Sequence, residues 1–315
     1  MILVAGDPRE PMVEAVHAEL KRRGRPVCLL ANYDLPGTVS FSLGLGAPTG
    51  AGEFRSPDLR VDLKEVRSVY QRLGFSDFET FEGYSQAEGE FVSSECMAAL
   101  STLFNHLPAL VVNRPVASGT NASKPFQISL VEAYGFRIPE TLVTTMSDAA
   151  AEFYENHQGQ VIYKSISYVR SIVQRMKPED LERLDRLRTC PVQLQQAVEG
   201  TDIRVHVVGD RTFASLIQAE ESDYRYDKKA EVVAHELDPD VARRCCEAAR
   251  GLGMHLAGID LRVSPEGEYY CFEVNPSPAF SWYEDRTGQP ITAALCDLLE
   301  AGRDQPSRSS QDSSS

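Results

Sequence analysis

The stretch GIDLRVSPEGEYYCFEVNP, residues 258–276, constrains the fold more than any other part of the 315-residue chain. In its first half, apolar and charged residues alternate: Ile259, Leu261 and Val263 with Asp260 and Arg262. Because successive side chains of a strand point to opposite faces, this alternation predicts a strand with one buried and one polar face. The sequence Pro-Glu-Gly at 265–267 predicts a turn, and hence a return strand beside the first.

The return strand shows the same alternation. We expect one set of its residues to face the core and the other to face away: Tyr270, Phe272 and Val274 against Cys271, Glu273 and Asn275. If the apolar faces of both strands share the core, Asp260, Glu273 and Asn275 converge on the opposite face. The sequence therefore predicts two carboxylates and an amide oxygen close together.

This set of oxygen atoms has no lysine next to it in the sequence and predicts an unneutralised anionic site. Mg²⁺ is the cation that fits best, since it prefers oxygen ligands and is usually completed by water and substrate phosphates. The alternative is the solvated polar face of an ordinary antiparallel hairpin, which the hairpin taken alone would favour.

Two lysines point to a phosphate ligand. Lys124 lies at the expected start of a helix, where the helix dipole disfavours a cation unless an anion is bound there. Lys164 lies inside the apolar strand VIYKSI, where a charge needs a partner or access to solvent. Taken singly, each lysine also fits a surface residue with a buried aliphatic stem.

The order of the remaining elements indicates an α/β protein of two domains. A strand, a helix and a strand are expected at Ile2–Ala5, Glu10–Arg23 and Val27–Ala31, followed by an irregular connection over 42–57. The cluster of Asn, Pro, Ser and Gly at 113–123 marks a boundary. We expect an N-terminal α/β domain at 1–112, a second domain at 113–301 with lobes at 113–188 and 189–301, and a disordered tail at 302–315.

Charge and composition limit the function classes. The net charge of −14 and pI near 5.0 argue against nucleic acid as a partner. No signal peptide or run of apolar residues long enough to span a bilayer is evident, so we expect a cytoplasmic protein without membrane contact. Seven cysteines without paired C-x-x-C spacing are typical of reduced thiols.

Read in order, these motifs resemble the ATP-grasp superfamily, above all the RimK-type glutamate ligases and the microviridin or graspetide peptide ligases. NRPVASGTNASKPFQISLVEAYGFRIPETLVTT resembles the segment with the first nucleotide lysine, here Lys124, and VIYKSI the strand with the second, Lys164. The resemblance implies a nucleoside site at the hinge LQQAVEGTDIRVHVVG: Gln196, Ala197, Val198 and Asp202. It also implies phosphate-side residues Arg225 and Asp227 in SDYRYD, and metal ligands Asp260, Glu273 and Asn275.

The resemblance implies the fold and the activity as well. The fold is a pre-ATP-grasp α/β domain, then an ATP-grasp domain that holds ATP between two α+β lobes. ATP with Mg²⁺, as two ions that Mn²⁺ can replace, activates a carboxylate as an acyl phosphate that an amine or hydroxyl then attacks. Arg262 and Arg204 are the candidates for holding the carboxylate or acyl phosphate. The alternative is a salt bridge to Glu273 for Arg262 and an ion pair on the strand face for Arg204.

The subgroup resemblance rests on SVYQRLGF, LVVNRP and PEGEYYCFEVNP…WYEDRTGQPI. It implies a ribosomal precursor peptide as substrate and a homodimer. Gln196 replaces the usual Glu of the hinge, Asp227 replaces Asn, and SISYVRS replaces a glycine-rich cover. These departures keep two alternatives open: a ligase for a small amino acid or dipeptide, and a nucleotide-binding module without turnover.

Overall fold

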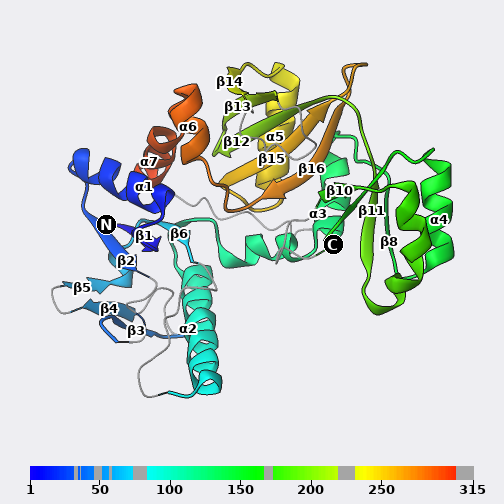
Figure 1. Cartoon of the computed structure of the whole chain (residues 1–315). Coiled ribbons are helices and arrows are strands. Elements are labelled where there is room, and N and C mark those ends of the chain that lie inside the picture. The colour runs from blue at the N-terminus through cyan, green and yellow to red at the C-terminus, as the bar shows by residue number, and fades with distance from the viewer. Residues whose placement is uncertain are drawn as a thin grey trace, which may run out of the picture. The chain divides into compact units, whose positions relative to one another are not determined.

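The computed structural model describes residues 1–31, 35, 37–45, 52–56, 59–73, 84–166, 173–218 and 231–302 (Figure 1). The chain forms two compact units, Met1–Pro115 with Thr292–Ser315 and Val116–Ile291. The tail at 302–315, which was expected to be disordered, lies outside the described residues apart from Gly302. Among the described helices, none is long and apolar enough to cross a membrane.

The first unit is built on a parallel sheet of order β2-β1-β6-β7. Its elements are β1 (Ile2–Gly6), α1 (Pro11–Arg22), β2 (Val27–Ala31), β6 (Ser68–Arg72), α2 (Gln86–His106) and β7 (Leu110–Val112). Every residue of β1 is buried, as expected for a central parallel strand covered on both faces. Helix α2 begins with a capping box between Ser85 and Glu88. The predicted strands and helices of this region are confirmed to within about two residues.

The prediction of an irregular connection over 42–57 is wrong for its described residues. A three-stranded antiparallel sheet is present there, with β3 (Ser40–Leu43), β4 (Gly52–Ser56) and β5 (Leu59–Asp62). The rings of Phe41 and Phe54 lie 6.0 Å apart and give it an apolar face. Gly52 is needed because a Cβ there would lie 2.2 Å from the carbonyl oxygen of Ser42. The glycine that suggested a loop thus permits close strand pairing.

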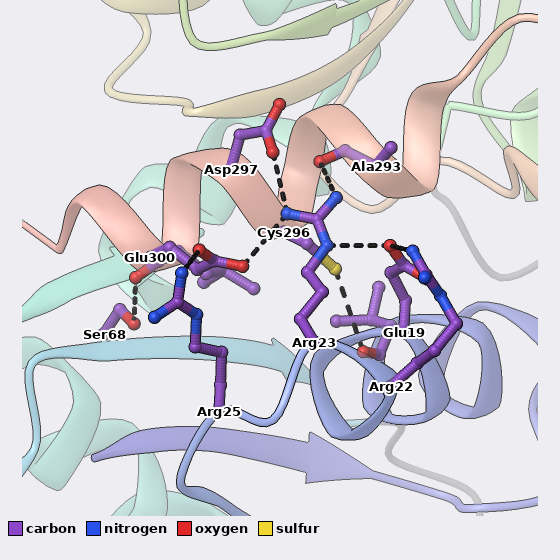
Figure 2. Close-up of polar contacts among 11 residues, drawn as sticks. Glu19, Arg22, Arg23, Arg25, Ser68, Ala293, Cys296, Asp297 and Glu300 are labelled. Atoms are coloured by element: carbon purple, nitrogen blue, oxygen red, sulfur yellow. Dashed lines mark hydrogen bonds and ion pairs between the residues drawn. The ribbon is translucent and has the colours of Figure 1, made fainter.

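The last helix, α7 (Ile291–Ala301), packs in the first unit, whereas the sequence placed 113–301 in one domain. Figure 2 shows the reason: Arg23, after α1, donates to Asp297 and Glu300 of α7 at 2.7 and 3.0 Å. The hydroxyl of Ser68 in β6 donates to the carbonyl of Leu299 at 2.7 Å. These partners are more than 200 positions apart, which explains why local patterns did not assign the helix.

The second unit contains two antiparallel sheets, of order β10-β9-β11-β8 and β14-β13-β12-β15-β16. The strands of the first are β8 (Thr141–Thr144), β9 (Val161–Lys164), β10 (Val173–Arg175) and β11 (Val192–Gln196). Those of the second are β12 (Thr201–Val208), β13 (Arg211–Gln218), β14 (Glu231–His235), β15 (Leu256–Val263) and β16 (Tyr269–Asn275). Strands β15 and β16 of the second sheet form the hairpin predicted at 258–276, and β12, β13 and β14 extend the sheet from β15.

Helices α3 (Lys124–Val131) and α5 (Pro239–Gly251) pack on one face of the five-stranded sheet, and α4 (Ser147–Asn156) packs on the four-stranded sheet. Helix α6 (Ser281–Thr287) lies on the opposite face of the five-stranded sheet, where its Tyr283 is near Arg204 and His206. The 3₁₀ helices are η2 (Leu63–Glu65) in the first unit, η3 (Pro115–Ala122) at the boundary, and η4 (Glu132–Tyr134) and η5 (Pro178–Thr189). Ile203, Val205 and Val207 of β12 pack with α5 in one buried core. Asp202 and Arg204, which alternate with these residues, therefore lie on the opposite face, where Arg262 and Asp260 of β15 lie opposite them.

Candidate active site

The β15–β16 hairpin brings Asp260 and Glu273 directly opposite each other. The pairing then shifts, because Leu261 lies opposite Cys271 and Phe272 is an extra residue on β16. This bulge reverses the predicted alternation: Cys271 is buried in the core, and Phe272 lies on the polar face, with its ring near Arg262. The prediction that Cys271 shares a face with Glu273 is wrong. The predicted approach of Asp260 and Glu273 is confirmed.

Both carboxylates already have cationic partners. Arg204 of β12 donates from Nη1 to Oδ1 of Asp260 at 2.6 Å, and Lys124 of α3 donates from Nζ to Oε2 of Glu273 at 3.1 Å. The prediction of an unneutralised anionic site is therefore wrong. Lys124 is 149 positions from Glu273, so their proximity is a property of the tertiary fold.

Helix α3 is held against β16 by a buried hydrogen bond. The backbone N–H of Val274 donates to Oε1 of Gln127 at 3.0 Å, and Gln127 is fully buried. Lys124 lies one turn earlier on the same helix, with Ser123 as its N-cap residue. The bond therefore fixes the helix start beside Glu273, where helix N–H groups and the Lys124 ammonium can meet an anion.

Gly258 makes room for Arg204. A Cβ at Gly258 would lie 2.1 Å from Nη2 of Arg204 and 2.7 Å from Cβ of Pro278. We expect Gly258→Ala to displace the guanidinium from Asp260 and to lower ATP turnover about a hundredfold, as for loss of a preorganised charge-stabilising donor. Steady-state kinetics and thermal unfolding measure the two effects.

Gly267→Ala is the matched control for this variant. Gly267 lies in the hairpin turn at φ 84°, with open space around it, so an alanine there strains only the backbone. It should cost about 1 kcal/mol of stability and leave turnover unchanged. Equal loss of activity in the two variants would show that Gly258 acts only through folding.

Lys164 projects from β9 toward the bulge of β16, and its Nζ lies 5.2 Å from the centre of the Phe272 ring. Arg262 approaches the same ring at 5.5 Å. Burial lowers the pKa of Lys164 to about 8; the charge of Glu273 raises this pKa in part, and the charge of Lys124 lowers it further. A lysine that is hard to protonate in the free protein gains from a bound anion.

The hinge residues lie where β11 ends. The backbone N–H groups of Gln196 and Ala197 donate to the carbonyls of Glu140 and Gln160, each at 2.9 Å. Val198 follows them and is buried. The two amides are therefore used within the protein, and contact with a nucleoside must come from other atoms of this segment.

Arg262 binds the hinge rather than Glu273. It donates from Nε and Nη2 to the two oxygens of Asp202 at 2.7 and 2.8 Å, and from Nη1 to the carbonyl of Val198 at 2.8 Å. This bidentate pair fixes the loop after β11 on β15. The geometry favours a positioning role for Arg262 over the direct substrate contact predicted from the sequence, and its partner is not the Glu273 considered as the alternative.

Two glutamines of β11 were not selected from the sequence. Gln193 and Gln195 are 3% and 1% exposed, and the side-chain oxygen of each has no hydrogen bond within the described part of the chain. Gln193 lies opposite Lys164. Because the Thr141 hydroxyl donates to the Pro139 carbonyl at 2.9 Å, it accepts from Nε2 of Gln195 at 3.0 Å. Gln195 therefore presents a buried acceptor to the face that carries Lys164.

His206 is a further buried group next to this site. It follows Arg204 on the same face of β12, and its ring lies 4.8 Å from that of Tyr283. Burial and then the nearby Arg204 charge hold the pKa of His206 well below its ordinary value. The imidazole is therefore neutral and adds no second cation beside Arg204.

The predicted ligands are all oxygens, which suit Mg²⁺ or Mn²⁺ better than a metal that prefers nitrogen or sulfur. Among the described residues, no three His, Cys, Asp or Glu side chains group to hold a metal. Asp260, Glu273 and the amide of Asn275, whose Oδ1 also accepts from the Ser277 N–H at 2.8 Å, form an all-oxygen set that leaves coordination positions for phosphate and water. The predicted Arg225, Asp227 and residues 167–171 of SISYVRS lie outside the described residues.

Comparison with known proteins shows the family of the chain. Residues 127–299, more than half of the chain, match the RimK-like ATP-grasp domain family. The chain therefore belongs to the RimK-like ATP-grasp family, whose members are ligases that use ATP to form C–N or C–O bonds. A probable alpha-L-glutamate ligase of Shewanella loihica is 25% identical over 210 residues, covering 62% of this chain and 69% of that protein.

Solved structures extend the likeness to nearly the whole chain. The macrocyclase MdnC from Microcystis aeruginosa, solved with its precursor peptide MdnA, has a TM-score of 0.84 and 21% identity and covers 96% of this chain and 100% of its own. At this sequence identity, the similarity to MdnC is evidence for a common fold. The ATP-grasp ligase PsnB, solved with a minimal precursor, has a TM-score of 0.81 and 27% identity, covering 96% and 98%. Another PsnB structure contains Mg and ADP.

Proposed function

We propose that this ATP-grasp ligase modifies a ribosomal precursor peptide by joining a side-chain carboxylate to an amine or hydroxyl of the same peptide. The observation that carries the proposal is the charge cluster of the second unit: Lys124 pairs with Glu273, Glu273 lies opposite Asp260, and Lys164 interacts with both carboxylates. Support for a peptide substrate comes from MdnC and PsnB, which were solved with precursor peptides and resemble this chain along 96% of its length.

The chain's own residues have separable tasks in this proposal. Lys124 and Lys164 bind the nucleotide phosphates, and the acceptor oxygen of Gln195 suits the 6-amino group of adenine. Asp202 and the hinge bind the nucleoside, with Arg262 holding Asp202 in place. Asp260, Glu273 and Asn275 hold Mg²⁺, which offsets the charge that develops on the transferred phosphoryl group.

Arg204 is the residue proposed to meet the substrate carboxylate and the acyl phosphate. Its side chain is 7% exposed, and its guanidinium is oriented by Asp260 at the edge of the proposed metal site. A fixed guanidinium binds a carboxylate or a phosphoryl group with two parallel hydrogen bonds. Attack by an amine or hydroxyl then releases phosphate. The predicted homodimer stays a prediction.

A ligase for a small amino acid is the second candidate, because curated relatives from Shewanella loihica and Pseudoalteromonas translucida carry the name probable alpha-L-glutamate ligase. The two substrate classes differ in what stimulates ATP consumption. Phosphate release is measured with the enzyme, Mg²⁺ and ATP, adding either a precursor peptide encoded beside the enzyme or glutamate and short peptides.

For a peptide ligase, only the precursor peptide should stimulate phosphate release, and its mass should fall by one water for each bond formed. Stimulation by glutamate or a dipeptide alone, with a product of that size, would replace the peptide substrate by a small one. ATP binding without turnover under any condition would favour the nucleotide-binding module. The Arg204→Lys variant, which lacks the guanidinium proposed to bind the substrate carboxylate, is the control for nonspecific ATP hydrolysis.

A further inference from the structure

The charge balance of the active-site face has a consequence for metal binding. Asp260 and Glu273 carry two negative charges, which Arg204 and Lys124 balance through direct hydrogen bonds. Lys164 adds a further positive charge when protonated, and it interacts with both carboxylates. A free divalent cation would therefore enter a site with no net negative charge, which disfavours binding at these short distances.

The two cations differ in how easily they can move. The Arg204 side chain is 7% exposed and lies in the space left by Gly258, so its position is set by packing. It binds Oδ1 of Asp260, and Oδ2 has no partner within the described residues, which leaves that oxygen for a metal. Arg204 can thus stay in place while Asp260 coordinates.

Lys124 has more freedom. Its side chain is 15% exposed and makes one described hydrogen bond, to Oε2 of Glu273. It extends from the first turn of α3 on a flexible four-carbon stem. As long as the ammonium is bound to Glu273, its charge lies beside a proposed metal ligand. A nucleotide phosphate is the partner that would draw the ammonium away from this carboxylate.

We propose that Lys124 is an internal counter-ion that keeps Glu273 from binding a free divalent cation and releases it when nucleotide phosphates arrive. The proposal rests on the proposed function, since it assigns Glu273 to metal and Lys124 to phosphate. Metal binding is then conditional on nucleotide, and the enzyme takes up the metal together with ATP or ADP. Lys124 acts on the metal site through its charge and not as a ligand.

The experiment uses Mn²⁺ alone as the probe, with free Mn²⁺ measured by electron paramagnetic resonance and no nucleotide present. Without Lys124 the carboxylates lose one balancing charge, so Lys124→Met should bind free Mn²⁺ at least about tenfold more tightly than the parent. Lys124→Arg keeps the charge and should bind as weakly as the parent. Lys177→Met, at an exposed lysine of the same unit, is the matched control and should change nothing.

Equal Mn²⁺ affinity of Lys124→Met and the parent would overturn the proposal, as would tight binding of free Mn²⁺ by the parent. Circular dichroism checks the fold, and Lys124→Gln, which keeps the length and polarity of the side chain, replaces Lys124→Met if that variant does not fold. A separate titration of the parent with Mn²⁺ and ADP together tests the proposed function. If the parent does not bind Mn²⁺ with ADP, the proposed nucleotide site is wrong. If the parent binds Mn²⁺ with ADP tightly but Lys124→Met and the parent bind free Mn²⁺ equally, only the counter-ion role of Lys124 is wrong.

Discussion

Glu273→Gln is expected to lower ATP turnover at least about a hundredfold while the protein stays folded. The substitution keeps the size of the side chain but removes the charge that a divalent ion needs, and electrostatic stabilisation by a metal supplies several kcal/mol in such reactions. Glu273 lies opposite Asp260 on the paired strand, so it could coordinate the same ion or bridge two. Asn275→Ala should be milder, because it removes one neutral oxygen that water can replace.

Stability measurements on the same preparation separate catalysis from folding. The Lys124–Glu273 pair is partly exposed, at 15% and 22%, so its loss should cost no more than about 1 kcal/mol without Mg²⁺. Glu266→Gln, in the exposed turn of the same hairpin, is the control and should keep full activity. If turnover of Glu273→Gln falls only in proportion to the folded fraction, Glu273 is a structural residue of the hairpin.

Lys164 is expected to make nucleotide affinity depend on pH. Its pKa in the free protein is about 8, so the ammonium that attracts phosphate is lost as the pH rises through 8, and affinity should decline above that value. Bound phosphate raises this pKa, so binding near pH 8 should take up a proton. Calorimetry in buffers of different ionisation enthalpy measures that uptake. The effect on stability has the opposite sign. Between pH 8 and about 10.4, the pKa of lysine in the unfolded chain, deprotonation of Lys164 should raise the free energy of unfolding of the free protein, because the folded state no longer buries a charged ammonium.

Two substitutions test the assignment to Lys164. Lys164→Met should weaken nucleotide binding about tenfold or more and abolish proton uptake near pH 8, since a charge-assisted contact to phosphate is lost. Lys164→Arg keeps the charge and does not titrate, so it should bind nucleotide without the decline above pH 8. If Lys164→Met binds as tightly as the parent at pH 7, Lys164 is structural.

The regular elements that carry the site could be predicted because each follows a local pattern. Strand β15 alternates apolar and charged residues over 259–263. Helix α3 begins after Ser123, and the 3₁₀ helix η4 that follows it ends at Gly135, which adopts a φ of 82°. The bulge at Phe272 could not be predicted. One extra residue exchanges the sheet faces to which the preceding residues of β16 point, and the apolar pattern of the strand is compatible with either register. This is why Cys271 was misplaced and Phe272 was assigned to the core.

The charge partners were the other part that the sequence could not supply. Lys124 and Glu273, Arg204 and Asp260, and Arg262 and Asp202 each come from separate strands or helices 56 to 149 positions apart. The sequence therefore indicated an anionic cluster at Asp260 and Glu273, whereas in the fold Arg204 and Lys124 neutralise these carboxylates. Gln195 was also missed. Its side-chain oxygen is recognised as a free acceptor only in the fold, where its amide nitrogen donates to the hydroxyl of Thr141 on the neighbouring strand.

The central claim is that one face of the second unit binds a nucleotide together with a divalent cation. Calorimetric titration of the full chain with a non-hydrolysable ATP analogue, with and without millimolar Mg²⁺, tests it most directly. The structure predicts saturable binding that strengthens with Mg²⁺ in the parent, loses this Mg²⁺ dependence in Glu273→Gln, and weakens in Lys164→Met. No detectable heat of binding in the parent at millimolar Mg²⁺, or binding that is the same in all three proteins, would contradict it.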